Sequence, residues 1–340
     1  MFVNRNIKWD VILRFAWVYL IIFILWDTLV LFAIHELEHK GINPHIPFLP
    51  LSTIGIAVAF YLGFKNNAAY DRFWEARKIW GGIVNYSRTW GNQVMGFVTN
   101  KHSGEPLSDE ALKSVHKELI YRHIAWINAV RLHLRKPNPN AIRVTKAAKR
   151  TLLMNAPEDS HWRDEVFAFI PKGECSELYP VVNKPTQIIR KQGERLRTLT
   201  EEGGYIDDFR HMEMMRVLEE FYNLQGKCER IKNTPFPRQY GFFSMLFTWI
   251  FILLLPFGML GEFAEMGHSL QWLAVPFCVL ISWIFMTMEL IGDNSEDPFE
   301  GFVNDVPMNA ICRAIEIDLR EMLGETDLPA KVEPVNGILM

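Results

Sequence analysis

Residues 46–64 read IPFLPLSTIGIAVAFYLGF and continue directly into residues 65–77, KNNAAYDRFWEAR. The first segment has no charged side chain and is long enough to cross the hydrocarbon core of a bilayer as a helix. Lys65 and the two asparagines that follow it are side chains that we expect in water. The sequence therefore predicts a membrane span that ends abruptly in solvent.

Two sets of residues recur at every fourth position of this span and form neighbouring stripes on a helix. The small stripe is Gly55, Ala59 and Gly63, and the bulky apolar stripe is Ile56, Phe60 and Phe64. Small residues allow membrane helices to approach closely. If several copies of the helix surround an axis, the bulky stripe forms stacked hydrophobic collars that can gate a pore by dewetting. The alternative is that the bulky stripe faces lipid or packs against a neighbouring helix.

Three further segments are apolar over a spanning length, so the sequence predicts an all-α, polytopic membrane protein. The four spans are approximately residues 15–34, 46–64, 240–260 and 270–288. Between the second and third spans the chain is rich in charge, and its periodicity predicts helices over 109–135, 183–201 and 207–232. We divide the chain into an N-terminal interfacial helix with two spans (1–64), a cytoplasmic helical domain (65–239), the last two spans (240–291), and an acidic turn, amphipathic helix and extended tail (292–340).

The distribution of basic residues predicts the orientation of these spans. Lys and Arg number three before the first span, one in residues 35–45, 29 in residues 65–239, none in residues 261–269 and three after the fourth span. By the positive-inside rule, both termini and the large helical domain lie in the cytoplasm, as in a multi-pass protein of the inner (plasma) membrane. The net charge of −3 argues against nucleic acid as a partner.

Asp27 interrupts the first span, where a charged side chain is costly unless it faces protein or water. Trp26 and Thr28 flank it. We therefore expect a buried, hydrogen-bonded aspartate rather than a conduction site.

Residues His35, Glu36 and His39 match the H-E-x-x-H motif of zinc metallohydrolases. In that motif, two histidines four positions apart share one helical face and bind zinc, while the glutamate acts as a base on the metal-bound water. The motif here lies beyond the first span on the expected outer side, and no pattern for a third ligand follows it. It supports two interpretations, a membrane metallohydrolase and a solvated helix end.

Residues 292–301, GDNSEDPFEG, form an acidic turn in which Asp293, Glu296 and Asp297 are candidate ligands for a hard cation. Pro298 stands where an EF-hand loop needs glycine, so this segment is not an EF-hand. The alternative is a helix-ending turn with Ser295 or Asp297 as an N-cap.

We expect no cofactor. The cysteines are scattered, which predicts neither a disulfide nor a cysteine metal site: Cys175, Cys228, Cys278 and Cys312.

Residues 54–77, IGIAVAFYLGFKNNAAYDRFWEAR, resemble the signature segment of the bestrophin family in its prokaryotic branch. The similarity is carried by the Gly63-Phe64 pair and by Arg72 with Trp74, although Phe73 stands where the family usually has a tryptophan. The resemblance implies a homopentameric ion channel with four spans in each subunit around a central pore. It also implies that the residues lining the pore neck are those of the bulky stripe, Ile56, Phe60 and Phe64.

The same resemblance implies further properties of the chain. The family has a second, cytosolic constriction, which we place at Ile188 on the helix after Pro185. Residues 309–324 resemble the amphipathic segment that follows the fourth span in the family. Eukaryotic bestrophins bind calcium in an acidic cluster that corresponds to residues 292–301, but the acidic cluster of this chain is shorter, as in prokaryotic relatives. Calcium dependence is therefore not expected.

The sequence thus favours a homopentameric channel that passes monovalent ions through a hydrophobic neck and carries out no chemistry. Its expected partners are copies of itself, membrane lipids and the permeating ions. Animal bestrophins are anion channels and prokaryotic relatives resemble cation channels; the acidic residues of this chain favour sodium over chloride. The alternatives are a zinc metallohydrolase that uses His35, Glu36 and His39, and a scaffold or sensor that does not conduct.

Overall fold

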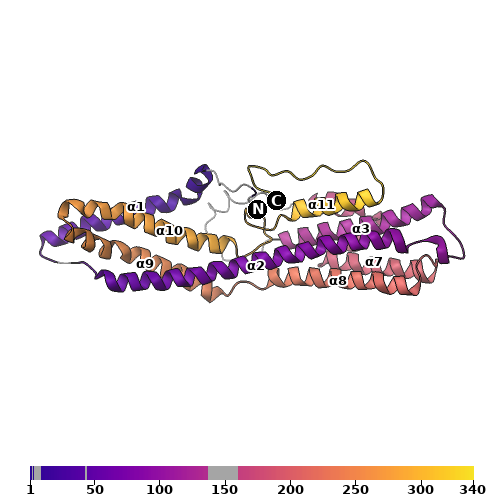
Figure 1. Cartoon of the computed structure of the whole chain (residues 1–340), viewed down its shortest axis with the longest axis horizontal. Coiled ribbons are helices and arrows are strands. Elements are labelled where there is room, and N and C mark those ends of the chain that lie inside the picture. Colours follow the sequence, from indigo (N-terminus) through magenta and orange to yellow (C-terminus); the bar gives the residue numbers. More distant parts are fainter. Residues whose placement is uncertain (2, 4–8, 43, 137–159) are drawn as a thin grey trace.

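The computed structural model describes the chain apart from residues 2, 4–8, 43 and 137–159 (Figure 1). The described chain is almost entirely helical, and its only β-type pairing is an isolated bridge between Val335 and Ile338. The basic run 143–150 lies outside the described residues. The long helices are α1 (Trp9–His39), α2 (Phe48–Phe97), α3 (Asp109–Arg135), α7 (Lys184–Glu201), α8 (Asp208–Asn233), α9 (Arg238–Glu265), α10 (Ala274–Asn294) and α11 (Met308–Met322). Two shorter helices are α5 (Ser160–Glu165) and α6 (Lys172–Leu178).

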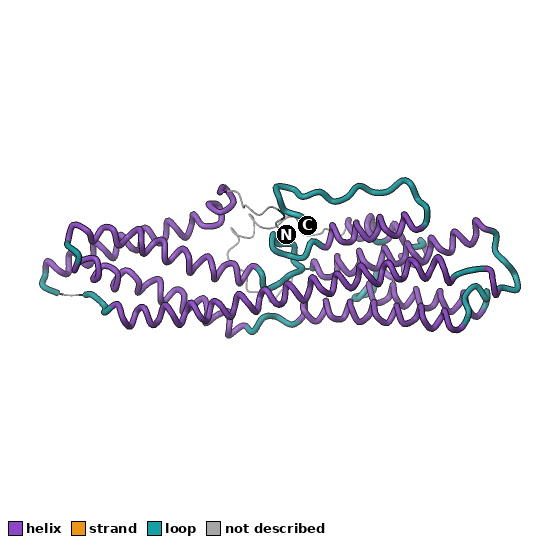
Figure 2. Tube along the Cα trace, in the orientation of Figure 1, coloured by secondary structure: helices purple, strands orange, loops and turns teal. Residues whose placement is uncertain are grey.

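The helices form an elongated bundle with two distinct ends (Figures 1 and 2). One end contains α1, α9, α10 and the first half of α2, and the other contains α3, α7, α8, α11 and the second half of α2. Helix α2 has 50 residues, which correspond to about 75 Å of continuous helix at 1.5 Å per residue. The expected domain boundary between residues 64 and 65 therefore lies inside one unbroken helix that joins the two ends.

Four of the described helices contain stretches that are long and apolar enough to cross a membrane, in α1, α2, α9 and α10. Large apolar side chains on these helices point outward, among them Leu25 and Leu29 on α1 and Phe277 on α10. Contiguous exposed apolar surface of this kind is unfavourable in water and suits a lipid environment. The predictions of an all-α fold and of four transmembrane helices are confirmed.

The other end of the bundle has a conventional buried core built around α3. Trp80 and Trp90 of α2 and Trp126 of α3 are completely or almost completely buried in it. His123 lies among these rings, and its Nε2 is 2.8 Å from the Ser87 hydroxyl oxygen. Burial lowers the pKa of His123 to about 3. This histidine is therefore neutral and part of the packing.

Side-chain caps explain why the helices at this end begin where the sequence predicts. The Ser108 hydroxyl accepts a hydrogen bond from the Ala111 amide, and the Asn183 side-chain oxygen accepts one from the Thr186 amide. The Asp207 carboxylate accepts one from the Arg210 amide. Each cap satisfies an amide that the first helical turn leaves without a partner. The predicted helices agree with α3, α7 and α8.

Candidate pore neck

The bulky stripe of α2 forms one exposed apolar face along the membrane-spanning half of the helix. Ile56, Phe60 and Phe64 are 71%, 69% and 54% exposed in the single chain. The Phe60 and Phe64 rings meet edge to face, with centroids 4.6 Å apart and an interplanar angle of 89°. From Ile56 to Phe64 the stripe is about 12 Å long at 1.5 Å per residue. It is a rigid, uncharged ladder of three large side chains that no other part of the described chain covers.

The opposite face of α2 is packed against the subunit's own membrane helices. Leu51, Val58 and Leu62 are buried with Phe251 of α9. Gly55 lies directly under that ring, since a Cβ at this position would be 2.8 Å from Phe251 Cε2. The two glycines of the small stripe lie in different environments. Gly55 is packed under Phe251, whereas Gly63 is exposed and has open space around its Cα. The packed face fixes the rotation of α2, and this rotation leaves the bulky stripe outward.

Lys65, immediately after the last stripe residue, is not in water as the sequence suggested. It is only 1% exposed, and its Nζ is 2.5 Å from both Glu289 Oε1 and Asp293 Oδ1 of α10. The Ser244 hydroxyl of α9 donates a hydrogen bond of 2.5 Å to Glu289 Oε2. We call Lys65, Glu289, Asp293 and Ser244 the exit cluster. Buried charges need partners, and here the partners come from the third and fourth membrane helices. The exit cluster joins α2, α9 and α10 at the residue that directly follows the bulky stripe.

Two further contacts hold α2 beyond the exit cluster. Gly292 allows α10 to approach closely, because a Cβ there would be 2.6 Å from Asn66 Oδ1. The Arg72 guanidinium donates hydrogen bonds to the backbone oxygens of Glu296 at 2.8 Å and Ile231 at 2.9 Å. The arginine therefore connects α2 to the end of α8 and to the turn after α10.

The carboxylates of the acidic turn form ion pairs with basic side chains of the same chain. Asp293 pairs with Lys65, Glu296 Oε1 is 3.4 Å from Arg238 Nη1, and Asp297 is 3.8 Å from Arg72 Nη2. Burial and the neighbouring Asp297 raise the pKa of Glu296, while Arg238 opposes this increase. Within the described residues, no three histidine, cysteine or acidic side chains are grouped as a metal site. The three candidate ligands for a hard cation are therefore engaged in ion pairs with side chains of α2 and α9.

The loop after the acidic turn is held by Asp305. Its Oδ2 accepts hydrogen bonds from the amides of Gly301 at 2.6 Å and Phe302 at 3.0 Å. Gly301 has a φ of +94°, a conformation that favours glycine. Burial raises the pKa of Asp305 to about 7, although these amides and Arg135 favour the charged form.

Ile188 does not occupy the position that we expected for a cytosolic constriction. It is 1% exposed and belongs to the core of its own subunit, where α7 packs on α3 and α8. A side chain in this position cannot project into a pore without unpacking the bundle. Ile188 lies on the packed face of α7.

Asp27 is buried, as predicted, but the predicted hydrogen bonds are missing. Its side chain is almost completely buried in α1, and neither carboxylate oxygen has a hydrogen-bond partner among the described residues. Asp27 belongs to α1, whereas the bulky stripe is carried by α2.

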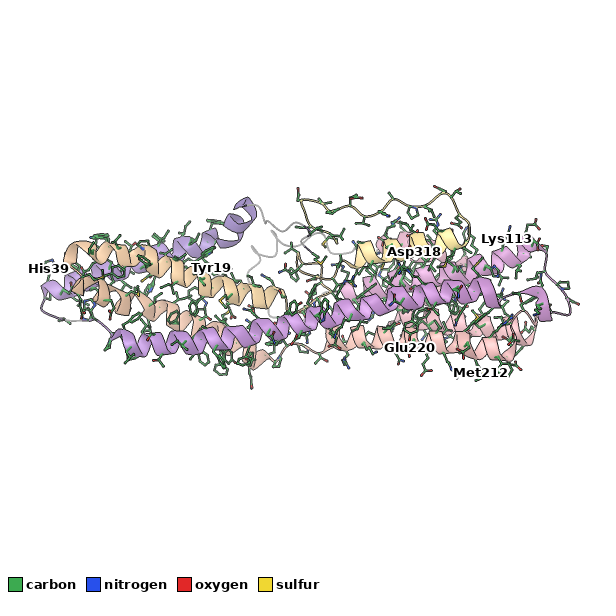
Figure 3. The ribbon with its side chains drawn as sticks, in the orientation of Figure 1. Tyr19, His39, Lys113, Met212, Glu220 and Asp318 are labelled. Carbon is green, nitrogen blue, oxygen red and sulfur yellow. The ribbon has the colours of Figure 1, made fainter. Side chains whose placement is uncertain are left out.

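His35 and His39 lie in the last turns of α1, and Figure 3 shows His39 at one end of the molecule. Their Nε2 atoms are 3.0 Å apart, and both side chains are exposed. Glu36 is also exposed. The four cysteines are all free thiols.

These features can be compared with known proteins. Residues 4–321 match the family described as Bacterial/Fungal Bestrophin protein. The chain belongs to the bestrophin family. This bestrophin is 31% identical over 311 residues to the voltage-dependent anion channel-forming protein YneE of Escherichia coli K12, covering 91% of this chain and 87% of that protein. A voltage-dependent anion channel-forming protein of Ralstonia nicotianae is 29% identical over 305 residues, covering 88% and 85% of the two chains. The crystal structure of a bacterial bestrophin homolog from Klebsiella pneumoniae is similar with a TM-score of 0.72 and 26% identity, covering 90% of this chain and 97% of that one.

Membership of the family decides between the interpretations of the sequence. The chain is a bestrophin-type channel in a membrane and not an enzyme. The zinc metallohydrolase alternative, based on His35, Glu36 and His39, is therefore wrong. The resemblance inferred from residues 54–77 is confirmed over nearly the whole chain.

Proposed function

We propose that this bestrophin assembles as a homopentamer in the plasma membrane and conducts monovalent cations through a neck formed by Ile56, Phe60 and Phe64. The observation that carries the proposal is the exposed apolar stripe of α2, which a single chain leaves uncovered. Stacked in a ring, these side chains form an uncharged constriction that dehydrated or partly hydrated ions must pass.

The need for several subunits follows from the arrangement of the membrane helices. Four spans packed against each other leave no space for a central pore inside one chain. A closed ring of identical subunits solves this problem with one repeated interface. The exposed Gly63 is suited to a close contact with a neighbouring copy of the chain. The number five rests on the family resemblance.

The charges around the neck exit support cations as the permeating species. The described side chains at this level include three cationic and four acidic groups: Lys65, Arg72 and Arg238, with Glu289, Asp293, Glu296 and Asp297. Among these seven groups, the carboxylates outnumber the cations by one in each subunit, and this difference is repeated around the ring. A negative local potential concentrates cations at a pore mouth.

Chloride conduction is the second candidate, because curated relatives are named voltage-dependent anion channel-forming proteins. An uncharged neck does not itself select a sign of charge. The two candidates share the same pore and differ only in the ion that crosses it.

The reversal potential distinguishes the candidates. The purified full chain is inserted into planar bilayers under a tenfold gradient of sodium chloride, for which ideal selectivity gives about 59 mV. We expect a value on the sodium side. A value on the chloride side would establish the second candidate, and no current from protein shown to be inserted would reject both.

The proposed orientation places both termini and the helical end of the bundle in the cytoplasm. It is supported by the basic residues, which are concentrated in 65–239 and nearly missing from the loops 35–45 and 261–269. Single cysteines introduced at Gly41 and Gly96 test this orientation in intact cells. We expect a membrane-impermeant maleimide to label only the cysteine at position 41, and labelling of only position 96 would reverse the orientation.

A further inference from the structure

The two histidines at the C-terminal end of α1 form a close pair that takes no part in the proposed neck. One Nε2 donates a hydrogen bond to the other across 3.0 Å, and the ring centroids are 4.4 Å apart at an interplanar angle of 78°. Both side chains are exposed, and Figure 3 shows His39 at the extreme end of the molecule. The two nitrogens can share one proton, and a metal ion can replace that proton.

We propose that His35 and His39 bind one divalent transition-metal ion per subunit, such as Zn²⁺, through their Nε2 atoms. A zinc–nitrogen bond is about 2.05 Å long, so two imidazole ligands of a tetrahedral ion lie about 3.3 Å apart. The separation of 3.0 Å in the structure is close to this value. The helix therefore presents both ligands at the chelating distance, and small side-chain rotations complete the site.

The electrostatic surroundings favour a cation at this position. Glu36 and Glu38 lie on the same turn of α1, and Lys40 is the only basic residue in 35–45 apart from the histidines. Glu38 also lines a hollow of about 690 Å³, whose mostly apolar and glycine lining includes two further carboxylates, those of Glu262 and Glu265. An acidic surface of this kind attracts divalent cations.

The site differs from a catalytic zinc centre in its ligands. Glu38 is 2.7 Å from His45 Nε2 and is engaged there. No third protein ligand joins the pair within the described residues, so water completes the coordination. Imidazole nitrogen suits zinc, copper and nickel, whereas magnesium and calcium prefer oxygen. Glu36, which a hydrolase would need as a base, has no role in this chelate.

Equilibrium dialysis of the purified full chain against Zn²⁺, followed by metal analysis, measures the proposed binding. We expect one ion per subunit, and a loss of affinity of at least about tenfold in either His35→Ala or His39→Ala, because the second ligand acts intramolecularly. Magnesium at the same concentration should not compete. Both histidines are exposed, so the variants should elute as the parent does in size-exclusion chromatography.

Two matched variants separate the chelate from other sources of binding. Glu36→Gln should lower the affinity by much less than either histidine variant, because it removes only the attraction of one exposed charge. His45→Ala, which removes the next histidine along the chain, should retain the parent affinity. Equal zinc binding by the parent and the His35→Ala/His39→Ala double variant would overturn the proposal. A loss of binding in Glu36→Gln as large as in His35→Ala would also contradict it, because the carboxylate would then be a ligand.

Discussion

Lys65→Met is the substitution that tests the exit cluster. In the parent, Lys65 neutralises Glu289, which is 1% exposed, and Asp293, whose side chain is about a quarter exposed. Asp293 can rehydrate when the lysine is removed, but Glu289 then keeps only the Ser244 hydroxyl as a partner. One buried carboxylate is therefore left without a counter-charge, and the expected loss of stability is about 3–5 kcal/mol.

A double variant tests whether this loss of stability comes from the unpaired charge of Glu289. Lys65→Met combined with Glu289→Gln removes the uncompensated charge, so the pair should be coupled by about 2–3 kcal/mol in a double-mutant cycle. The matched control is Arg88→Met, which breaks an exposed pair with Asp318 at 2.8 Å and should cost about 0–1 kcal/mol.

The assay is denaturant unfolding of the purified protein in mixed micelles, followed by helical circular dichroism. It gives the free energy of unfolding of the parent, both single variants, the double variant and the control. If Lys65→Met is no more destabilising than Arg88→Met, or if Glu289→Gln fails to restore stability, the exit cluster does not hold the three helices together.

Two further predictions concern the same end of the fold. Gly292→Leu should lower the midpoint of thermal unfolding because α10 must move away from Asn66, whereas Gly96→Leu, which has open space, should leave it nearly unchanged. The pKa of Asp305 is raised to about 7 from about 4 in an unfolded chain. The folded protein therefore binds an extra proton between these values, and this contribution to stability is lost as pH rises from about 4 to 7. Asp305→Asn should flatten that part of a plot of unfolding midpoint against pH, and an unchanged slope would contradict the assignment.

The proposed neck residues could be placed on one helical face from the sequence because this depends only on local periodicity. Ile56, Phe60 and Phe64 recur at four-residue intervals in an uncharged span, and such spacing places them on one face of a helix whatever the rest of the chain does. The caps at Ser108, Asn183 and Asp207 also depend only on residues close in sequence, because each accepts a hydrogen bond from an amide three residues later. The sequence therefore predicts the start of these helices as well.

The errors in the sequence interpretation share one physical cause, which is long-range packing. Lys65 looked solvated because its two partners on α10 are more than 220 residues away in sequence. Ile188 is on the helix expected to line a cytosolic constriction, but only the contacts with α3 and α8 decide which face of α7 is buried. For the same reason, the sequence could not show that the carboxylates of the acidic turn pair with Lys65, Arg72 and Arg238.

Single-channel conductance of a neck variant tests the central claim most directly. The variant is Ile56→Ala/Phe60→Ala/Phe64→Ala, which removes the bulky stripe from every subunit. Its matched control removes three similarly exposed apolar side chains from the outer face of α1, in Leu25→Ala/Leu29→Ala/Phe32→Ala. We predict a higher conductance for the neck variant and the parent value for the control. A neck variant that conducts as the parent does would show that these residues do not line the narrowest part of the pore.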